Sequence, residues 1–135
     1  MDRERIIIIL SDIKKYRKDL DDRNIKNIQD LENLEKYYAA SMILFSLLNR
    51  VIDIAQEIVI SKKYGMPASY KDTFRILSQR KFIEKDMLIE LEKFVDLRNS
   101  LSHEYYKLEA SAIFHAVNNI KSIDQFVDIV CDKIK

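Results

Sequence analysis

The sequence predicts an all-α fold, an antiparallel bundle of about five helices that forms one domain over residues 1–135. Apolar residues recur at spacings of three and four along most of the chain, which is the period of a helix with one buried face. The chain has only one glycine and one proline, so it holds few residues that favour tight turns. With 47% hydrophobic and 33% charged residues, its composition is that of a globular protein.

The first helix is expected at residues 2–20, because the polar run 21–24 then breaks the pattern. Its buried face is marked by apolar residues at the helical period: Ile6, Ile9, Leu10 and Ile13. Ile7 and Ile8 lie off that face. We therefore expect this helix to be buried on more than one side.

The second helix is the longest and is expected from a start between residues 27 and 32 to residue 63 or 64. Its period is carried by a series of mostly apolar residues: Leu31, Leu34, Tyr38, Ser41, Met42, Phe45, Leu48, Ile52, Ala55 and Val59. Gly65 stands where a left-handed C-terminal cap is wanted. Pro67 follows two residues later, as is common after helix ends.

Three more helices are expected at residues 70–80, 85–102 and 109–133. Ser69 can cap the first of these, with Asp72 at the third helical position. Apolar residues at spacings of three and four predict the inward faces of all three: Phe74, Leu77, Leu88, Leu91, Leu101, Ile113, Ile120, Ile123 and Val130.

Charge and cysteine content exclude several classes of protein. Lysine and arginine number 23 against 22 acidic residues, so no global basic field draws the chain onto nucleic acid. RNA binding would need a local patch or a site shared between subunits. The single cysteine, Cys131, fits a reducing compartment and is expected to be a small buried hydrophobe. The apolar run 6–10 is too short for a secretory signal, and charged residues interrupt the most apolar window, 42–60. We expect a cytoplasmic protein that does not span a membrane.

The densest group of polar side chains falls near the end of the fourth predicted helix. It contains Arg98, Asn99, His103, Tyr105 and Tyr106. On a straight helix, five residues turn about 140°, so Arg98 and His103 would not share a face. They can act together if the helix ends between them, or if two copies of the chain share the site.

The chemistry of these residues suits RNA cleavage without a metal. Imidazole titrates near neutral pH and can take a proton from, or give one to, a ribose oxygen. The guanidinium of Arg98 can bind phosphate and stabilise charge as a ribose 2′-hydroxyl attacks it. Asn99 can supply an orienting hydrogen bond. On spacing alone, the alternative of an ordinary exposed arginine and a structural histidine stays open.

Other polar residues give weaker indications. His115 stands alone on the last predicted helix. Asp53 and Glu57 lie one turn apart near Asn49, and they form either a polar element in a cleft or a solvated stripe with Arg50; spacing favours the stripe. No second histidine or cysteine pair accompanies His103, so no metal site is expected. No glycine-rich phosphate loop is present, and no cofactor is expected.

Residues 98–105, Arg-Asn-Ser-Leu-Ser-His-Glu-Tyr, resemble the Arg-Asn-x-Leu-x-His-x-Tyr signature of HepT-like proteins in the HEPN superfamily. The segments 108–109, 65–72 and 49–55 extend the likeness over most of the chain. In the last of these Asp53 is retained. An acidic residue is expected where Asn49 stands, so the chain departs from the family pattern there.

The resemblance implies a helical bundle that forms a homodimer, with Arg98 and His103 of two subunits in one cleft and with Asn99 and Asp53 in support. It implies a metal-independent ribonuclease toxin of a type VII toxin–antitoxin pair. Its partner would be an MntA-like nucleotidyltransferase antitoxin, which transfers AMP onto Tyr105 and could join it in a higher oligomer. The alternative, which Asn49 keeps open, is a non-catalytic helical partner that binds substrate or acts as a scaffold for a nucleotidyltransferase.

Overall fold

A computed structural model describes residues 2–104 and 107–134, apart from the side chain of Glu104. The described residues form helices and connecting segments and contain no strand, so the all-α prediction is confirmed. In chain order the helices are α1 (Arg3–Asp21), the 3-10 helix η1 (Ile28–Glu32), α2 (Leu34–Ser61), α3 (Tyr70–Gln79), α4 (Lys85–Glu104), α5 (Ala110–Asn118) and α6 (Lys121–Lys133).

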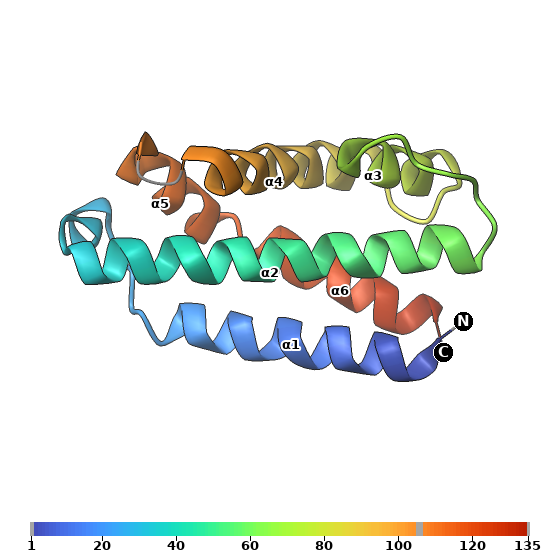
Figure 1. The fold of residues 1–135 in the computed structure, drawn as a ribbon, viewed down its shortest axis with the longest axis horizontal. Helices are drawn as coiled ribbons and strands as arrows, with labels where there is room; N and C mark the ends of the chain where they lie inside the picture. The colour runs from blue at the N-terminus through green and yellow to red at the C-terminus, as the bar shows by residue number, and fades with distance from the viewer. Residues whose placement is uncertain (1, 105–106, 135) are drawn as a thin grey trace.

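The long helix α2 is the centre of the bundle and contacts α1, α3, α4, α5 and η1. Figure 1 shows α1 and α4 on opposite sides of α2, each antiparallel to it, with α3 beside α4. Helix α6 packs on α4 and is tied to α1 by the ion pair of Arg17 with Asp124, 2.6 Å from Nε to Oδ1. The buried core is shared by all of these helices, and α2 contributes more of its residues than any other helix, among them Leu44, Leu47, Ile54 and Ile58.

Side-chain caps set several of the helix boundaries. The Ser69 hydroxyl accepts a hydrogen bond from the Asp72 backbone N–H at 3.0 Å, as expected from sequence. The Asn33 side chain caps α2 in the same way, accepting from Lys36 N–H at 3.0 Å. Its extended backbone separates α2 from η1, so the second predicted helix begins with a separate 3-10 turn.

The end of α2 differs from the prediction. Lys63, and not Gly65, takes the left-handed conformation next to the helix, with φ of 56°. The N–H of Tyr64 bonds to the Val59 carbonyl and the N–H of Lys63 to the Ile60 carbonyl, which is the Schellman arrangement. The helix therefore ends at Ser61, and Gly65, also at positive φ, lies in the loop beyond it.

The predicted fifth helix is two helices, α5 and α6, separated at Asn119 and Ile120. The side-chain amide of Asn119 donates to the His115 backbone carbonyl at 2.7 Å and competes with the helical ladder there. Buried residues nevertheless continue at spacings of three and four through Ile113, Ala116, Ile120 and Ile123. The sequence pattern therefore carried no sign of the break.

Several apolar side chains remain at the surface of the chain. Ile7 and Ile8 are 65% and 56% exposed, so the expectation that α1 is buried on a second side is wrong; α1 lies at the edge of the bundle (Figure 1). Cys131 is half-buried on α6 and not fully buried. Among the described residues, no helix has the length and apolar character needed to cross a membrane.

Candidate functional site

Arg98 lies on α4 between two aromatic rings. The carbon centre of its guanidinium is 5.3 Å from the ring centroid of Phe45 on α2 and 5.0 Å from that of Tyr70 at the start of α3. Both distances are in the range of cation–π attraction. Helices α2, α3 and α4 thus meet at the guanidinium of Arg98.

The hydrogen-bond partners of Arg98 are neutral. Its Nε donates to Asn49 Oδ1 at 2.7 Å, and its Nη1 donates to Asn99 Oδ1 at 3.2 Å. Within the described part of the chain no carboxylate forms an ion pair with Arg98. Four arginines that bridge helices or turns contrast with it, because each is paired with an acid: Arg5 with Glu57, Arg17 with Asp124, Arg50 with Asp12 and Arg75 with Glu92. Arg23, just beyond the end of α1, is also partly buried and forms no ion pair with a described residue, but no ring packs on it and its Nε has no hydrogen-bond partner there. Arg98 is therefore fixed in place without losing its charge.

Sequence reasoning identified Asn49 only as a departure from a family pattern. In the structure it is the closest hydrogen-bond partner of Arg98. Phe45 and Tyr70 were not identified as site residues from the sequence. Phe45 follows the apolar period of α2 and Tyr70 follows the cap of α3, and neither pattern indicates a contact with Arg98.

His103 is an exposed residue near the end of α4. The helix continues to Glu104, so it does not end between Arg98 and His103 as one expectation required. Five residues of helix set the two side chains about 140° apart. A single chain therefore places Arg98 and His103 on different sides of α4.

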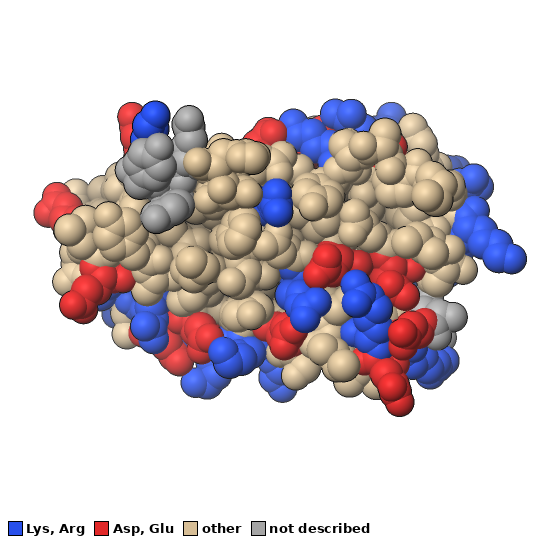
Figure 2. Space-filling view, in the orientation of Figure 1, with Lys and Arg blue, Asp and Glu red and all other residues tan. Residues whose placement is uncertain are grey.

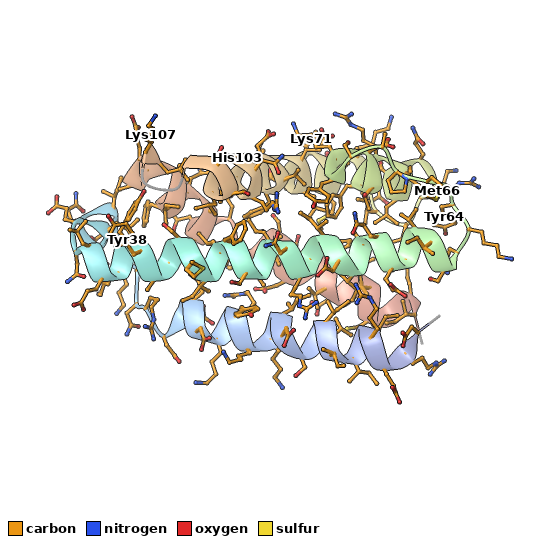
Figure 3. All side chains as sticks on the ribbon, viewed as in Figure 1. Tyr38, Tyr64, Met66, Lys71, His103 and Lys107 are labelled. Carbon is orange, nitrogen blue, oxygen red and sulfur yellow. The ribbon has the colours of Figure 1, made fainter. Side chains whose placement is uncertain are left out.

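Asn99 links the surroundings of the two residues. It accepts the Nη1 hydrogen bond of Arg98 and also lines an open hollow of about 320 Å³ with His103, Ser100, Lys107 and Leu108. Figure 3 shows His103 on the outer side of α4 and Lys107 beyond the end of that helix. No hydrogen bond to the His103 ring is made by a described residue, so no partner within that part of the chain sets its tautomer.

Asp53 is not brought into contact with Arg98. Its carboxylate lies 3.1 Å from Nη1 of Arg50, which also pairs with Asp12 of α1 at 2.8 Å. Glu57 accepts from Arg5 in a similar bridge to α1. Arg50 and Glu57 therefore join α2 to α1, and Asp53 pairs with Arg50 within α2, which agrees with a structural stripe on that side of α2.

The remaining sequence candidates lie apart from Arg98. Tyr105 and Tyr106 lie outside the described residues. His115 is exposed on α5, with its Nε2 3.4 Å from the Asn119 side-chain nitrogen. It lines a cavity of about 550 Å³ between α4 and α5, which adjoins the hollow at His103 through Ser100, Lys107 and Leu108. No three His, Cys, Asp or Glu residues gather as metal ligands among the described residues.

Exposed apolar residues form a row at the start of α2. Leu34, Tyr38 and Met42 are spaced by one turn on α2 and are 64%, 48% and 64% exposed. Figure 2 shows few charged atoms in the middle of the face where α2 and α4 meet, whereas charges crowd the part covered by α1. Exposed apolar side chains grouped in this way are typical of a protein–protein contact.

The chain is similar in sequence and in structure to known proteins. The family model described as Ribonuclease HepT-like matches residues 6–130. The mRNA nuclease HepT of Shewanella oneidensis is 34% identical over 80 residues, which are 58% of this chain and 60% of that protein. This match thus covers less than two thirds of the length of the curated relative.

Solved structures match over nearly the whole chain. The tri-AMPylated HEPN toxin of Shewanella oneidensis, in complex with an MNT antitoxin, superposes with a TM-score of 0.88 and 26% identity, over 98% of this chain and 99% of that one. A chain of a toxin–antitoxin complex with AMP-PNP superposes with a TM-score of 0.88 and 25% identity, over 96% of this chain and 99% of that one. The cytosolic protein YutE of Bacillus subtilis shares the fold, with a TM-score of 0.83 and 17% identity, over 99% of this chain and 91% of that one.

Proposed function

Because this chain belongs to the Ribonuclease HepT-like family, we propose that it is a toxin that cleaves RNA with Arg98 and His103. The observation that carries this proposal is the state of Arg98. Two neutral amides and two rings hold its guanidinium, and no described carboxylate neutralises it. A fixed cation with its charge intact is suited to a phosphodiester.

The proposed reaction is attack of a ribose 2′-oxygen on the adjacent phosphorus. The O2′–P bond forms and the P–O5′ bond breaks, which gives a 2′,3′-cyclic phosphate and a 5′-hydroxyl. His103 either takes the 2′-hydroxyl proton or gives a proton to the leaving 5′-oxygen, and water serves the other proton transfer. Arg98 stabilises the negative charge that builds up on the phosphorane. In this scheme these side chains supply the proton transfer and the positive charge, so no metal ion is needed.

The site is proposed to be completed by a second copy of the chain. Within one chain, Arg98 and His103 lie on different sides of α4, so one substrate is better served by Arg98 of one subunit and His103 of its partner. Leu34, Tyr38 and Met42 give an exposed apolar surface on which a copy could pack. The expected mass in solution is about twice the 16.0 kDa of the chain.

The proposed partner is a nucleotidyltransferase antitoxin. The similar Shewanella toxin is tri-AMPylated and bound to an MNT antitoxin, and the motif tyrosine of this chain is Tyr105. An AMP group there would bring a negative phosphate close in sequence to His103 and Arg98. It would repel RNA and compete for the cation.

One observation favours a second candidate function. A catalytic imidazole is usually oriented by a hydrogen-bonded partner, and His103 has none among the described residues. This suits the alternative of a non-catalytic scaffold for a nucleotidyltransferase. In the dimer proposed above, the partner subunit would have to supply that hydrogen bond.

The test is cleavage of RNA by purified protein in EDTA, comparing the wild type with Arg98→Ala and His103→Ala. Both variants should lose activity by at least about 100-fold. Arg80→Ala and His115→Ala are matched controls, since Arg80 also packs on a ring, that of Tyr64 at 5.3 Å, and His115 is exposed like His103. Cleavage that needs a metal, or that persists in His103→Ala, contradicts this mechanism. No cleavage by the wild type would leave the scaffold function.

A further inference from the structure

A cavity of about 490 Å³ opens beside Arg98, between α2, α4 and the start of α3. Its walls include Gln56 of α2, Ser69, Tyr70 and Arg75 at α3, and Asn99 of α4. Lys71, labelled in Figure 3 on the α3 side of the molecule, lies at its rim. The volume is within the range of small-molecule sites, roughly 300 to 1,000 Å³.

This cavity adjoins Arg98 directly, because two of the residues that line it also contact the Arg98 side chain. Tyr70 packs its ring on the guanidinium at 5.0 Å and also lines the cavity. Asn99 accepts from Arg98 Nη1 and lines the same cavity. A phosphate on Arg98 and a group in the cavity could therefore belong to one nucleotide.

The charges of the walls indicate which part of a nucleotide fits. Lys71 is paired with Asp96 at 2.7 Å, and Arg75 with Glu92 at 3.0 Å. Both cations are thus already balanced by acids, so the cavity offers no free charge to a second phosphate. A neutral, planar base suits such walls better than an anion.

The polar side chains of the walls can recognise a base. Gln56 is half-buried, and its side-chain amide has no hydrogen-bond partner among the described residues, so it can donate and accept at a base edge. Tyr70 is 37% exposed, and its ring can stack on a base. Aromatic stacking combined with amide hydrogen bonds is the usual way in which proteins read unpaired RNA bases.

We propose that this cavity holds the base of the nucleotide whose phosphate binds Arg98, so that Gln56 and Tyr70 set base preference at the cleavage position. This inference rests on the proposed ribonuclease function for its biological role. It makes the substrate single-stranded at the cut, since a paired base could not enter the cavity.

The first test uses binding alone. Isotope-labelled protein is titrated with each of the four nucleoside monophosphates and, separately, with inorganic phosphate, and NMR shifts are followed. The Gln56 side-chain amide should shift with at least one nucleotide and not with phosphate, whereas the backbone amides of residues 68–71, beside the contact of Tyr70 with Arg98, should shift with both. A Gln56 shift that is equal with phosphate alone, or no shift with any nucleotide, overturns the proposal.

The second test uses Gln56→Ala, with Gln125→Ala, an exposed glutamine of α6, as the matched control. Losing a hydrogen bond to the base should weaken nucleotide binding roughly 2- to 10-fold and flatten base preference in sequenced cleavage products. Gln125→Ala should match the wild type. Unchanged binding and preference in a folded Gln56→Ala protein refute the subsite. Wild-type protein that binds nucleotides but leaves RNA intact refutes the ribonuclease and keeps the subsite.

Discussion

The Oδ1 atom of Asn49 accepts a hydrogen bond of 2.7 Å from Nε of Arg98, and this contact joins α2 to α4. It holds the guanidinium with a neutral acceptor at a position where the family pattern leads one to expect an acid. Substitutions at residue 49 can therefore change the effective charge of the Arg98 guanidinium and its position separately. An acid would keep the guanidinium in place and reduce its effective charge, whereas an alanine would keep the charge and release the side chain.

Asn49→Asp should bind RNA more weakly than the wild type, because the carboxylate competes with phosphate for Arg98. The slope of log affinity against log salt concentration should become shallower by about 0.7 for each RNA phosphate that the variant no longer binds on a single strand. Asn49→Ala should instead lower kcat with a smaller change in salt dependence. Binding is measured by fluorescence anisotropy across a salt series.

Asn118→Asp, an exposed change on α5, is the control because it adds the same charge away from Arg98. Equal losses of affinity in Asn49→Asp and Asn118→Asp would mean that net charge alone is responsible. Faster cleavage by Asn49→Asp would show that orientation of Arg98 limits the reaction more than its charge.

The composite site predicts complementation between two inactive chains. A dimer of one Arg98→Ala chain and one His103→Ala chain keeps one intact pair, Arg98 from one subunit and His103 from the other. Random mixing makes about half of the dimers mixed, each with half of its pairs intact, so about a quarter of wild-type activity should return. Co-expressed, co-purified chains are assayed against each variant alone.

If both residues acted from the same chain, neither subunit of the mixed dimer would be complete and activity would stay at the level of the single variants. The same preparations report the mass by light scattering. A monomer that cleaves RNA contradicts the shared site directly.

The sequence predicted the first four helices because breakers are few and Ser69 is a recognisable cap. It did not identify the cap at Asn33, so its second helix began too early and included the 3-10 turn η1. It missed the break at Asn119 because the apolar period continues through it. Periodicity also cannot tell which face another helix covers, so Leu34 and Tyr38 belong to the predicted stripe and are nevertheless exposed.

Only part of the candidate site could be predicted from the sequence. Arg98 and His103 stand out by residue type and spacing, whereas the contacts of Arg98 with Asn49, Phe45 and Tyr70 span 28 to 53 residues and arise only when α2, α3 and α4 pack. Local sequence patterns carry no information on such contacts.

Tyr37 connects α2 to the segment that follows α4. Its buried hydroxyl donates to the backbone carbonyl of Leu108, and burial raises the pKa of Tyr37. Tyr37→Phe should lower the free energy of unfolding by about 1 kcal/mol. Thermal unfolding followed by circular dichroism measures this, with Tyr16→Phe on α1 as the control.

The same tyrosine predicts a pH effect with a definite sign. Its folded-state pKa lies above the unfolded value of about 10, so its contribution is complete below pH 10 and is lost as pH rises through the folded pKa. The stability difference between wild type and Tyr37→Phe should therefore shrink in strongly alkaline buffer. A difference that is constant up to high pH would contradict the burial of this hydroxyl.

Tyr105 is the proposed acceptor of AMP and directly follows the last residue of α4, Glu104. Incubation with the cognate nucleotidyltransferase and ATP should add AMP to Tyr105 and silence cleavage, because the new phosphate is negative and competes for Arg98. Tyr105→Phe should escape modification and stay toxic beside the antitoxin, whereas Tyr106→Phe should be modified and neutralised like the wild type. Intact-mass and peptide mass spectrometry locate the adduct. AMP on Tyr106 would show that the assignment is wrong, and the absence of any adduct would favour a scaffold role.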